Sequence, residues 1–299
     1  MSVDQEEKSG LNFATFDRLE DTPDPFLQIR ELGLEAHAAE LDEYGYTIVP
    51  PEKVGPPGFI AEVRERMIEL AAKQFELGVD DVNDPATTVD HPIFFTHQLL
   101  GQGEVFERVL MNPVSLALIS HLLGESCVLS SMTGFMKGPG ENSLELHTDN
   151  VAIPSPFPPY SQVANSTLIM SDYSAEMGSL CFAPRSHKLG RHPLPSEVSD
   201  SKLAVPVEAE AGSLIVFHGN TWHGAQARRA PGYRFTLIQY FVRMYLLRQE
   251  NVDYVTDEMR ARNSPRFRRL VGDYLPYPFS LAGQDKMFAA NAAGKYQHT

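Results

Sequence analysis

The spacing of hydrophobic positions divides the chain into a helical beginning and a strand-rich remainder. A polar, Asp- and Pro-rich stretch at 76–104 predicts an irregular segment around Phe94-Phe95. A short strand is predicted at 46–49, before two prolines. Apolar residues at helical spacing predict helices over about 26–41, 59–70 and 113–123, the last ending at Gly124.

Beyond Gly124 the chain has the pattern of a β protein, with short apolar runs separated by loops that contain Pro and Gly. Helical spacing returns only from about residue 255. The pattern therefore predicts a mainly β fold with flanking helices, a double-stranded β-helix of the jelly-roll, cupin-like type. The predicted strands are 127–131, 134–137, 144–149, 166–171, 179–184, 212–217 and 233–242.

The length of 299 residues is enough for one large domain with its own core. Residues 1–25 are acidic and carry few large apolar side chains, so we expect a flexible acidic arm there. Residues 26–299 are predicted to form a single jelly-roll domain with N- and C-terminal helices.

Composition restricts the kinds of binding partner and the cellular location that we expect for the protein. The net charge of −14 disfavours nucleic acid or an anionic membrane surface as a partner. No run approaches the roughly 18 apolar residues of a membrane span. The two cysteines cannot form a disulfide framework, and the N-terminus lacks the pattern of a signal peptide, so we expect a cytoplasmic protein. A homodimer is left open.

Residues 143–149 carry the first candidate chemistry. In a strand, alternation would direct Leu144 and Leu146 into a core and place His147 and Asp149 together on the other face. An imidazole and a carboxylate that leave the backbone roughly 7 Å apart can meet at one metal ion. The pair alone is a weak signal, because most such pairs are ordinary surface residues.

A second segment, 212–223, is an apolar strand that ends in a loop with His218 and His223. Either histidine would complete a set of two histidines and one carboxylate, which is typical of non-haem Fe(II) oxygenases because it leaves three coordination positions open. A zinc hydrolase could use the same three groups. A metal-free binding protein with a jelly-roll fold is the third interpretation.

A third segment, 233–240, offers an anion site. Alternation places Arg234 and Thr236 on the same face, where a guanidinium and a hydroxyl could bind one carboxylate.

Five arginines near the C-terminal end of the chain have two interpretations: they form a solvated helix face, or they bind an acidic group of the substrate as a clamp. They are Arg260, Arg262, Arg266, Arg268 and Arg269.

Together these segments resemble the phytanoyl-CoA dioxygenase family of Fe(II)/2-oxoglutarate-dependent oxygenases, over about residues 40–242. The order of the motifs and the eleven-residue spacing from His223 to Arg234 carry the resemblance. Arg185 departs from it, because glycine is usual at that position before Ser-His. The matching segments are 41–49, 121–124, 135–140, 147–149, 171–174 and 178–188.

The resemblance implies a site and an activity. Its spacing favours His223 over His218, so the implied Fe(II) ligands are His147, Asp149 and His223. The cosubstrate 2-oxoglutarate would bind Arg234 and Thr236, with Lys137 nearby. The implied enzyme is a dioxygenase that uses O2 to oxidise a small molecule, most readily by hydroxylation, and releases succinate and CO2. The retained Asp149 argues against halogenation, and desaturation, epoxidation and rearrangement stay open.

The substrate prediction rests on the stretch that follows Asp149. Four prolines in residues 150–160 stiffen it, and Ile153, Phe157 and Tyr160 would offer apolar surface at the cavity mouth. The stretch 274–279 could close the other side. We therefore expect a mid-sized, largely apolar substrate. In the alternative interpretation, both stretches only cover a hydrophobic edge of the barrel.

Overall fold

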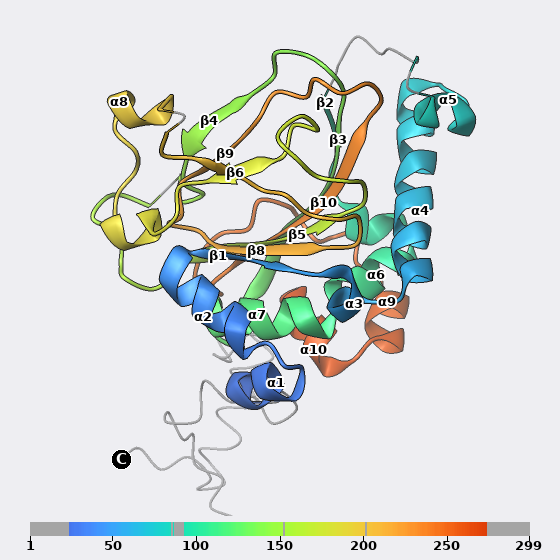
Figure 1. The fold of residues 1–299 in the computed structure, drawn as a ribbon. Coiled ribbons are helices and arrows are strands. Elements are labelled where there is room, and N and C mark those ends of the chain that lie inside the picture. Colours follow the sequence, from blue (N-terminus) through green and yellow to red (C-terminus); the bar gives the residue numbers. More distant parts are fainter. Residues whose placement is uncertain (1–23, 85, 87–92, 152, 201, 274–299) are drawn as a thin grey trace, which may run out of the picture.

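The computed structural model describes residues 24–273 except 85, 87–92, 152 and 201. Within these residues two antiparallel sheets enclose a cavity, and helices cover the outer face of the larger sheet (Figure 1). The predicted mainly β fold with flanking helices is confirmed, and its sheets are antiparallel. The predicted arm at 1–25, apart from its last two residues, and the stretch 274–279 lie outside the described residues.

The larger sheet has six strands and the smaller has four, and every pairing between neighbours is antiparallel. In order, the larger sheet consists of β1 (Tyr46–Val49), β8 (Leu214–His218), β5 (Val163–Ile169), β10 (Arg234–Val242), β3 (Val128–Lys137) and β2 (Ile93–Thr96). The smaller sheet consists of β4 (Leu144–His147), β9 (His223–Ala225), β6 (Leu180–Phe182) and β7 (Val205–Pro206).

Successive side chains of the central strands point in turn toward the helices and toward the space between the two sheets. In β8, Leu214 and Val216 join the core beneath the helices, whereas Ile215 and Phe217 join a smaller cluster between the sheets. Because side chains of a strand point to opposite faces in turn, one apolar strand can serve both layers.

Helices α2 (Glu35–Tyr44) and α7 (Pro113–Leu123) pack on the large sheet. The Asn112 side chain accepts hydrogen bonds from the N–H groups of Val114 and Ser115 at the start of α7, and Gly124 follows its last residue at φ 79°. The other helices are α1 (Pro25–Glu31), α3 (Pro51–Val54), α4 (Pro57–Phe75), α5 (Val79–Asn83), α6 (Glu104–Leu110), α8 (Pro195–Val198), α9 (Asp257–Arg262) and α10 (Pro265–Leu270), with short 3-10 turns at Leu99–Gln102 and Ser186–Leu189.

Two local predictions are wrong. The segment 76–104 is not irregular throughout, because α5, β2 and a 3-10 turn lie within it. The two strands predicted around 127–137 are a single strand, β3. At Gly134, the first residue of the second predicted strand, a Cβ would lie 2.9 Å from Sδ of Met67 in α4, so the glycine permits close packing of the helix on the sheet.

Arg185 has a left-handed backbone with φ 68°, in the turn before Ser186. Glycine reaches this conformation without steric cost, which accounts for the glycine that the resemblance led us to expect. The Arg185 side chain forms an ion pair with Glu43 at 2.5 Å.

The arginines of the tail bind within the helical layer. Arg262 donates from Nε to the Glu107 carboxylate at 2.9 Å, and Arg266 donates to the backbone carbonyl of Glu125 at 2.7 Å. These bonds attach α9 and α10 to the rest of the helices. None of the five arginines lines the cavity between the sheets, so the clamp interpretation is not supported.

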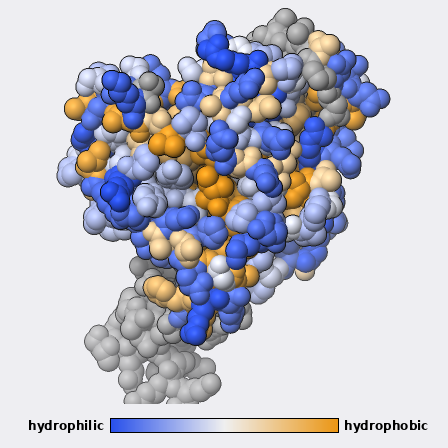
Figure 2. Space-filling view, in the orientation of Figure 1, coloured by the Kyte–Doolittle hydropathy of each residue, from blue (hydrophilic) through white to orange (hydrophobic). Residues whose placement is uncertain are grey.

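The described surface is mostly hydrophilic in the view of Figure 2, with hydrophobic residues gathered near the middle of that face. Among the described helices, none combines the length and the apolar character that crossing a bilayer requires.

Gly224 allows β9 to approach β4, because a Cβ there would lie 2.3 Å from the Leu144 carbonyl oxygen. We predict that Gly224→Ala lowers the free energy of unfolding by about 1–3 kcal/mol, the usual cost of overpacking. Urea denaturation measures the change. Gly58→Ala is the control, since a Cβ there meets nothing within 4 Å; equal stability of both variants would contradict the role of Gly224.

Candidate active site

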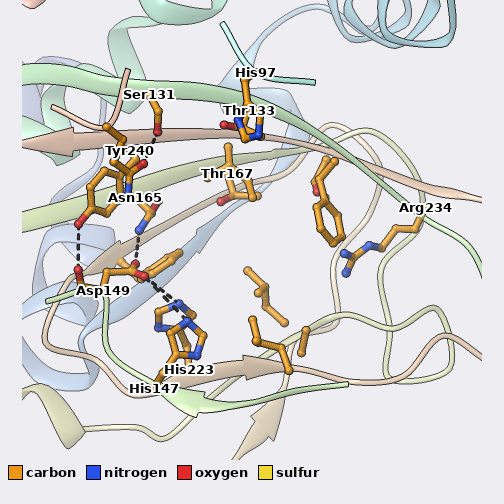
Figure 3. Close-up of a pocket in the computed structure, with 18 of the residues that line it drawn as sticks. His97, Ser131, Thr133, His147, Asp149, Asn165, Thr167, His223, Arg234 and Tyr240 are labelled. Carbon is orange, nitrogen blue, oxygen red and sulfur yellow. Dashed lines mark hydrogen bonds and ion pairs between the residues drawn. The ribbon is translucent and has the colours of Figure 1, made fainter. Parts of the chain in front are cut away.

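A cavity of about 510 Å³ lies between the two sheets, and both sheets line it. Figure 3 shows the polar side chains that point into it from opposite walls. The lining residues of the small sheet and its loops include Leu144, His147, Asp149, Leu180, His223 and Ala225; those of the large sheet include Ser131, Thr133, Phe135, Asn165, Thr167, Phe217, Arg234, Thr236, Ile238 and Tyr240.

The structure brings His147, Asp149 and His223 together. One ligand atom from each lies within 4.8 Å of the others. The Asp149 Oδ1 is 4.0 Å from Nε2 of His147 and 3.6 Å from Nε2 of His223. The two histidines are partners in the β4–β9 pairing, which places their rings side by side. Three such donors converging on one point can hold a divalent metal ion.

Backbone carbonyls orient both imidazoles. Nδ1 of His147 lies 2.8 Å from the Glu145 carbonyl oxygen, and Nδ1 of His223 lies 3.0 Å from that of Thr221. A carbonyl only accepts, so each Nδ1 carries the proton and each Nε2 presents a lone pair toward Asp149. Burial lowers the pKa of His223, which favours the neutral ring that a metal requires.

The predicted alternation within 143–149 is wrong at one place. Leu144 does not point into a core; it is 51% exposed and lines the cavity. The cause is a bulge, because Leu144 pairs with Ala225 and His147 with His223, so the register shifts by one residue between them. Asp149 lies beyond the end of β4, in the loop that follows.

The structure separates the two candidate histidines of the 212–223 segment. His218 ends β8 and lines a second cavity on the other side of the strand, where its Nδ1 accepts the Asn220 N–H at 3.0 Å. Burial lowers the pKa of His218 to about 3, so its ring is neutral. Only His223 of this pair lines the cavity with His147 and Asp149.

The end of the cavity at Arg234 is positively charged. Arg234 is 2% exposed, donates to the Gly178 carbonyl, and lies over the rings of Phe135 and Tyr173. Lys137 is its partner in the β3–β10 register; it does not line the cavity, and its Nζ donates to the Gln226 carbonyl at 2.5 Å. Burial and the neighbouring Arg234 lower the pKa of Lys137 to about 8.

Sequence reasoning missed several cavity residues. Asn165 falls one residue before the strand predicted at 166–171, whereas the observed β5 begins at Val163. With a predicted strand that began at residue 163, alternation would have placed Asn165 and Thr167 together on the cavity face. His97, Gln249 and Glu250 also line the cavity, from segments outside the strands. No local signal identifies them, because long-range contacts bring their segments to the cavity.

The three residues predicted to bind substrate lie elsewhere. Phe157 and Tyr160 line the second cavity, of about 480 Å³, together with His218, and Ile153 lines neither cavity. Phe157 is buried with its ring edge-on to His192, at 4.7 Å between centroids. The expected position of these residues at the mouth of the cavity that holds His147, Asp149 and His223 is therefore wrong, and their role in binding substrate stays a prediction.

A family model described as phytanoyl-CoA dioxygenase matches residues 41–236. The chain belongs to the phytanoyl-CoA dioxygenase family. The match covers both strands of the metal cluster and ends two residues beyond Arg234, so the family resemblance found in the sequence is confirmed.

Curated relatives are distant. "Dioxygenase af480" of Aspergillus fumigatus is 26% identical over 196 residues, which is 64% of this chain and 61% of that protein. The uncharacterized protein Rv1501 of Mycobacterium tuberculosis is 26% identical over 179 residues, 56% of this chain and 63% of that one. The chain therefore spans about three fifths of the length of these relatives.

Solved structures share the fold at lower identity. HygX from Streptomyces hygroscopicus, with nickel and 2-oxoglutarate bound, has a TM-score of 0.59 and 17% identity, with 76% of this chain and 93% of that chain covered. The alpha-ketoglutarate-dependent epimerase SnoN of nogalamycin biosynthesis has a TM-score of 0.54 and 22% identity, with 73% and 84% covered.

His223 and His218 provide a direct test of the cluster. We predict that His223→Ala weakens Co(II) binding more than about 100-fold, beyond the range of changes to outer residues, because it removes a donor atom. His218→Ala should keep the affinity within about threefold, since His218 faces the other cavity. Co(II) titration followed by visible absorption measures both. Loss in His218→Ala with retention in His223→Ala would reverse the assignment.

Proposed function

We propose that this protein is an Fe(II)- and 2-oxoglutarate-dependent oxygenase that hydroxylates a mid-sized small molecule. The observation that carries the proposal is the presence, in one cavity, of the His147–Asp149–His223 cluster and the buried guanidinium of Arg234. The overall reaction would convert substrate, O2 and 2-oxoglutarate into hydroxylated product, succinate and CO2.

The donor set fits iron. Two neutral imidazole nitrogens and one carboxylate oxygen on one side of an ion form the facial triad of non-haem Fe(II) oxygenases. Bound iron supplies the open positions at which a keto acid and oxygen react. His147 and His223 would bind through Nε2, the atoms that the backbone carbonyls leave free, and Asp149 through Oδ1.

The charged end of the cavity fits the cosubstrate. Nε of Arg234 is buried and has no hydrogen-bond partner within the described part of the chain, which is costly unless a ligand supplies an acceptor. The far carboxylate of 2-oxoglutarate is such a ligand, and the Thr236 hydroxyl faces the same cavity. Lys137 would contribute charge from behind this carboxylate without contacting it.

The known relatives support this assignment. HygX was solved with nickel and 2-oxoglutarate, and SnoN is named an alpha-ketoglutarate-dependent epimerase. A zinc hydrolase or a metal-free binding protein has no need of a buried arginine facing the same cavity as the metal cluster. Both alternatives are therefore less well supported.

The cavity has both apolar and polar walls. Phe217, whose ring lies 4.7 Å from that of His223, and Ile238 present apolar surface, whereas Ser131, Gln249 and Glu250 present polar groups. Such a site favours a mid-sized molecule that has both an apolar part and hydrogen-bonding groups. This differs from the largely apolar wall expected from the sequence.

Anaerobic addition of Fe(II) and 2-oxoglutarate tests the proposed function directly. We expect a visible charge-transfer band that needs both additions, because chelation of iron by the keto acid creates it. Zn(II) in place of Fe(II) is the control and should give no band. Hydrolase activity with Zn(II), without a band with Fe(II), would favour the zinc alternative.

Arg234→Lys tests the cosubstrate site. Lysine keeps the charge but loses the planar two-point contact, so the KM for 2-oxoglutarate should rise more than tenfold, given about 1.5–3 kcal/mol for a charged hydrogen bond. Succinate release measures KM, and the melting temperature controls for folding. An unchanged KM would place the carboxylate elsewhere.

A further inference from the structure

The Asp149 side chain has two oxygens in different surroundings. Oδ1 faces Nε2 of both histidines, whereas Oδ2 accepts a hydrogen bond from the Asn165 amide. Asn165 is 3% exposed, so this bond is shielded from water. A carboxylate oxygen only accepts, so the amide must present its NH2 group here.

The backbone of Asp149 is held as well. Its carbonyl oxygen accepts a hydrogen bond from the Tyr240 hydroxyl at 2.9 Å, and its N–H donates to the Gly219 carbonyl at 3.1 Å. Figure 3 shows Asn165 and Tyr240 pointing toward Asp149 from the same side.

These contacts cross from one sheet to the other. Asn165 and Tyr240 are register partners in β5 and β10 of the large sheet, whereas His147 and His223 belong to the small sheet. Asp149 lies in a loop, so its own strand does not fix it. The large sheet therefore sets the position of the carboxylate relative to the two imidazoles.

We propose that Asn165, assisted by Tyr240, is a positioning residue that keeps Asp149 a ligand through one oxygen. With the amide bound to Oδ2, the carboxylate is held with Oδ1 toward the two imidazoles, so Oδ1 is the oxygen that it would offer to an ion. A carboxylate free to turn could bind through both oxygens and cover a position that the cosubstrate or oxygen needs. This inference rests on the proposed metal site.

Asn165→Leu is the main test, because leucine has a similar volume and no donor. We expect Co(II) affinity to fall about 10- to 100-fold, the range for residues that orient a metal ligand. The visible absorption of bound Co(II) should also change, since it reports the number of ligand atoms. A residue that only fills space would leave both measurements unchanged.

Ser166→Ala is the matched control. Ser166 is the next residue of β5, is equally buried, and bonds to Ser115 at 2.6 Å on the helix side of the sheet. Its loss should lower the melting temperature while Co(II) affinity stays within about threefold. A comparable loss of affinity in this variant would mean that general destabilisation of β5 explains the effect, and would overturn the proposal.

Tyr240→Phe provides a second test should the leucine variant fail to fold. It removes one neutral hydrogen bond and keeps the ring, so Co(II) affinity should fall roughly 3- to 10-fold with little change in melting temperature. Unchanged affinity in this variant, or in Asn165→Leu if it folds, overturns the proposal.

Wild-type behaviour separates this inference from the proposed function. Protein that binds Co(II) but never consumes 2-oxoglutarate would overturn the proposed function and leave the role of Asn165 standing. Normal 2-oxoglutarate consumption by the wild type, with unchanged Co(II) affinity in Asn165→Leu and Tyr240→Phe, would support the proposed function and overturn the role of Asn165. Wild-type protein with no Co(II) binding would overturn both.

Discussion

The close pairing of β4 with β9 is the contact on which the site depends. It places His147 opposite His223, so that two imidazoles from segments 76 residues apart share one point of the cavity. The approach is possible because Gly224 has no side chain to meet the Leu144 carbonyl. The bulge beside it rotates Leu144 into the cavity and lets the chain leave β4 toward Asp149.

The large sheet contributes the buried arginine of the cavity and the hydroxyl that holds the Asp149 backbone. Its strand β10 carries Arg234 at one end and Tyr240 at the other, both on the cavity face, with Phe235 and Leu237 buried under the helices. The strand therefore connects the site of Arg234 to the site where the Tyr240 hydroxyl holds the Asp149 carbonyl. Because its other face is part of the main core, the distance between the two sites is fixed by the rigid packing of that core.

The cavity is also electrically asymmetric. Lys137, Arg228 and Arg234 lie near one another, and the hydrogen bonds described for them go to backbone carbonyls and the Met177 sulfur. Burial, together with repulsion from Arg234 and Arg228, lowers the pKa of Lys137, and burial lowers that of Arg234. A carboxylate bound at that end would relieve this repulsion.

Sequence alone pointed to most of the chemistry-bearing residues. The spacing of His147 and Asp149 and the alternation of Arg234 and Thr236 are signals local to one segment, whereas the choice of His223 over His218 came from the family resemblance. Tertiary structure decided the rest. Glu250 reaches the cavity, and Asn165 meets Asp149, only through long-range contacts, and Phe157 lines another cavity because a loop's direction depends on what it packs against. Periodicity records which side of a strand a residue faces, and it carries no information about which distant segment lies there.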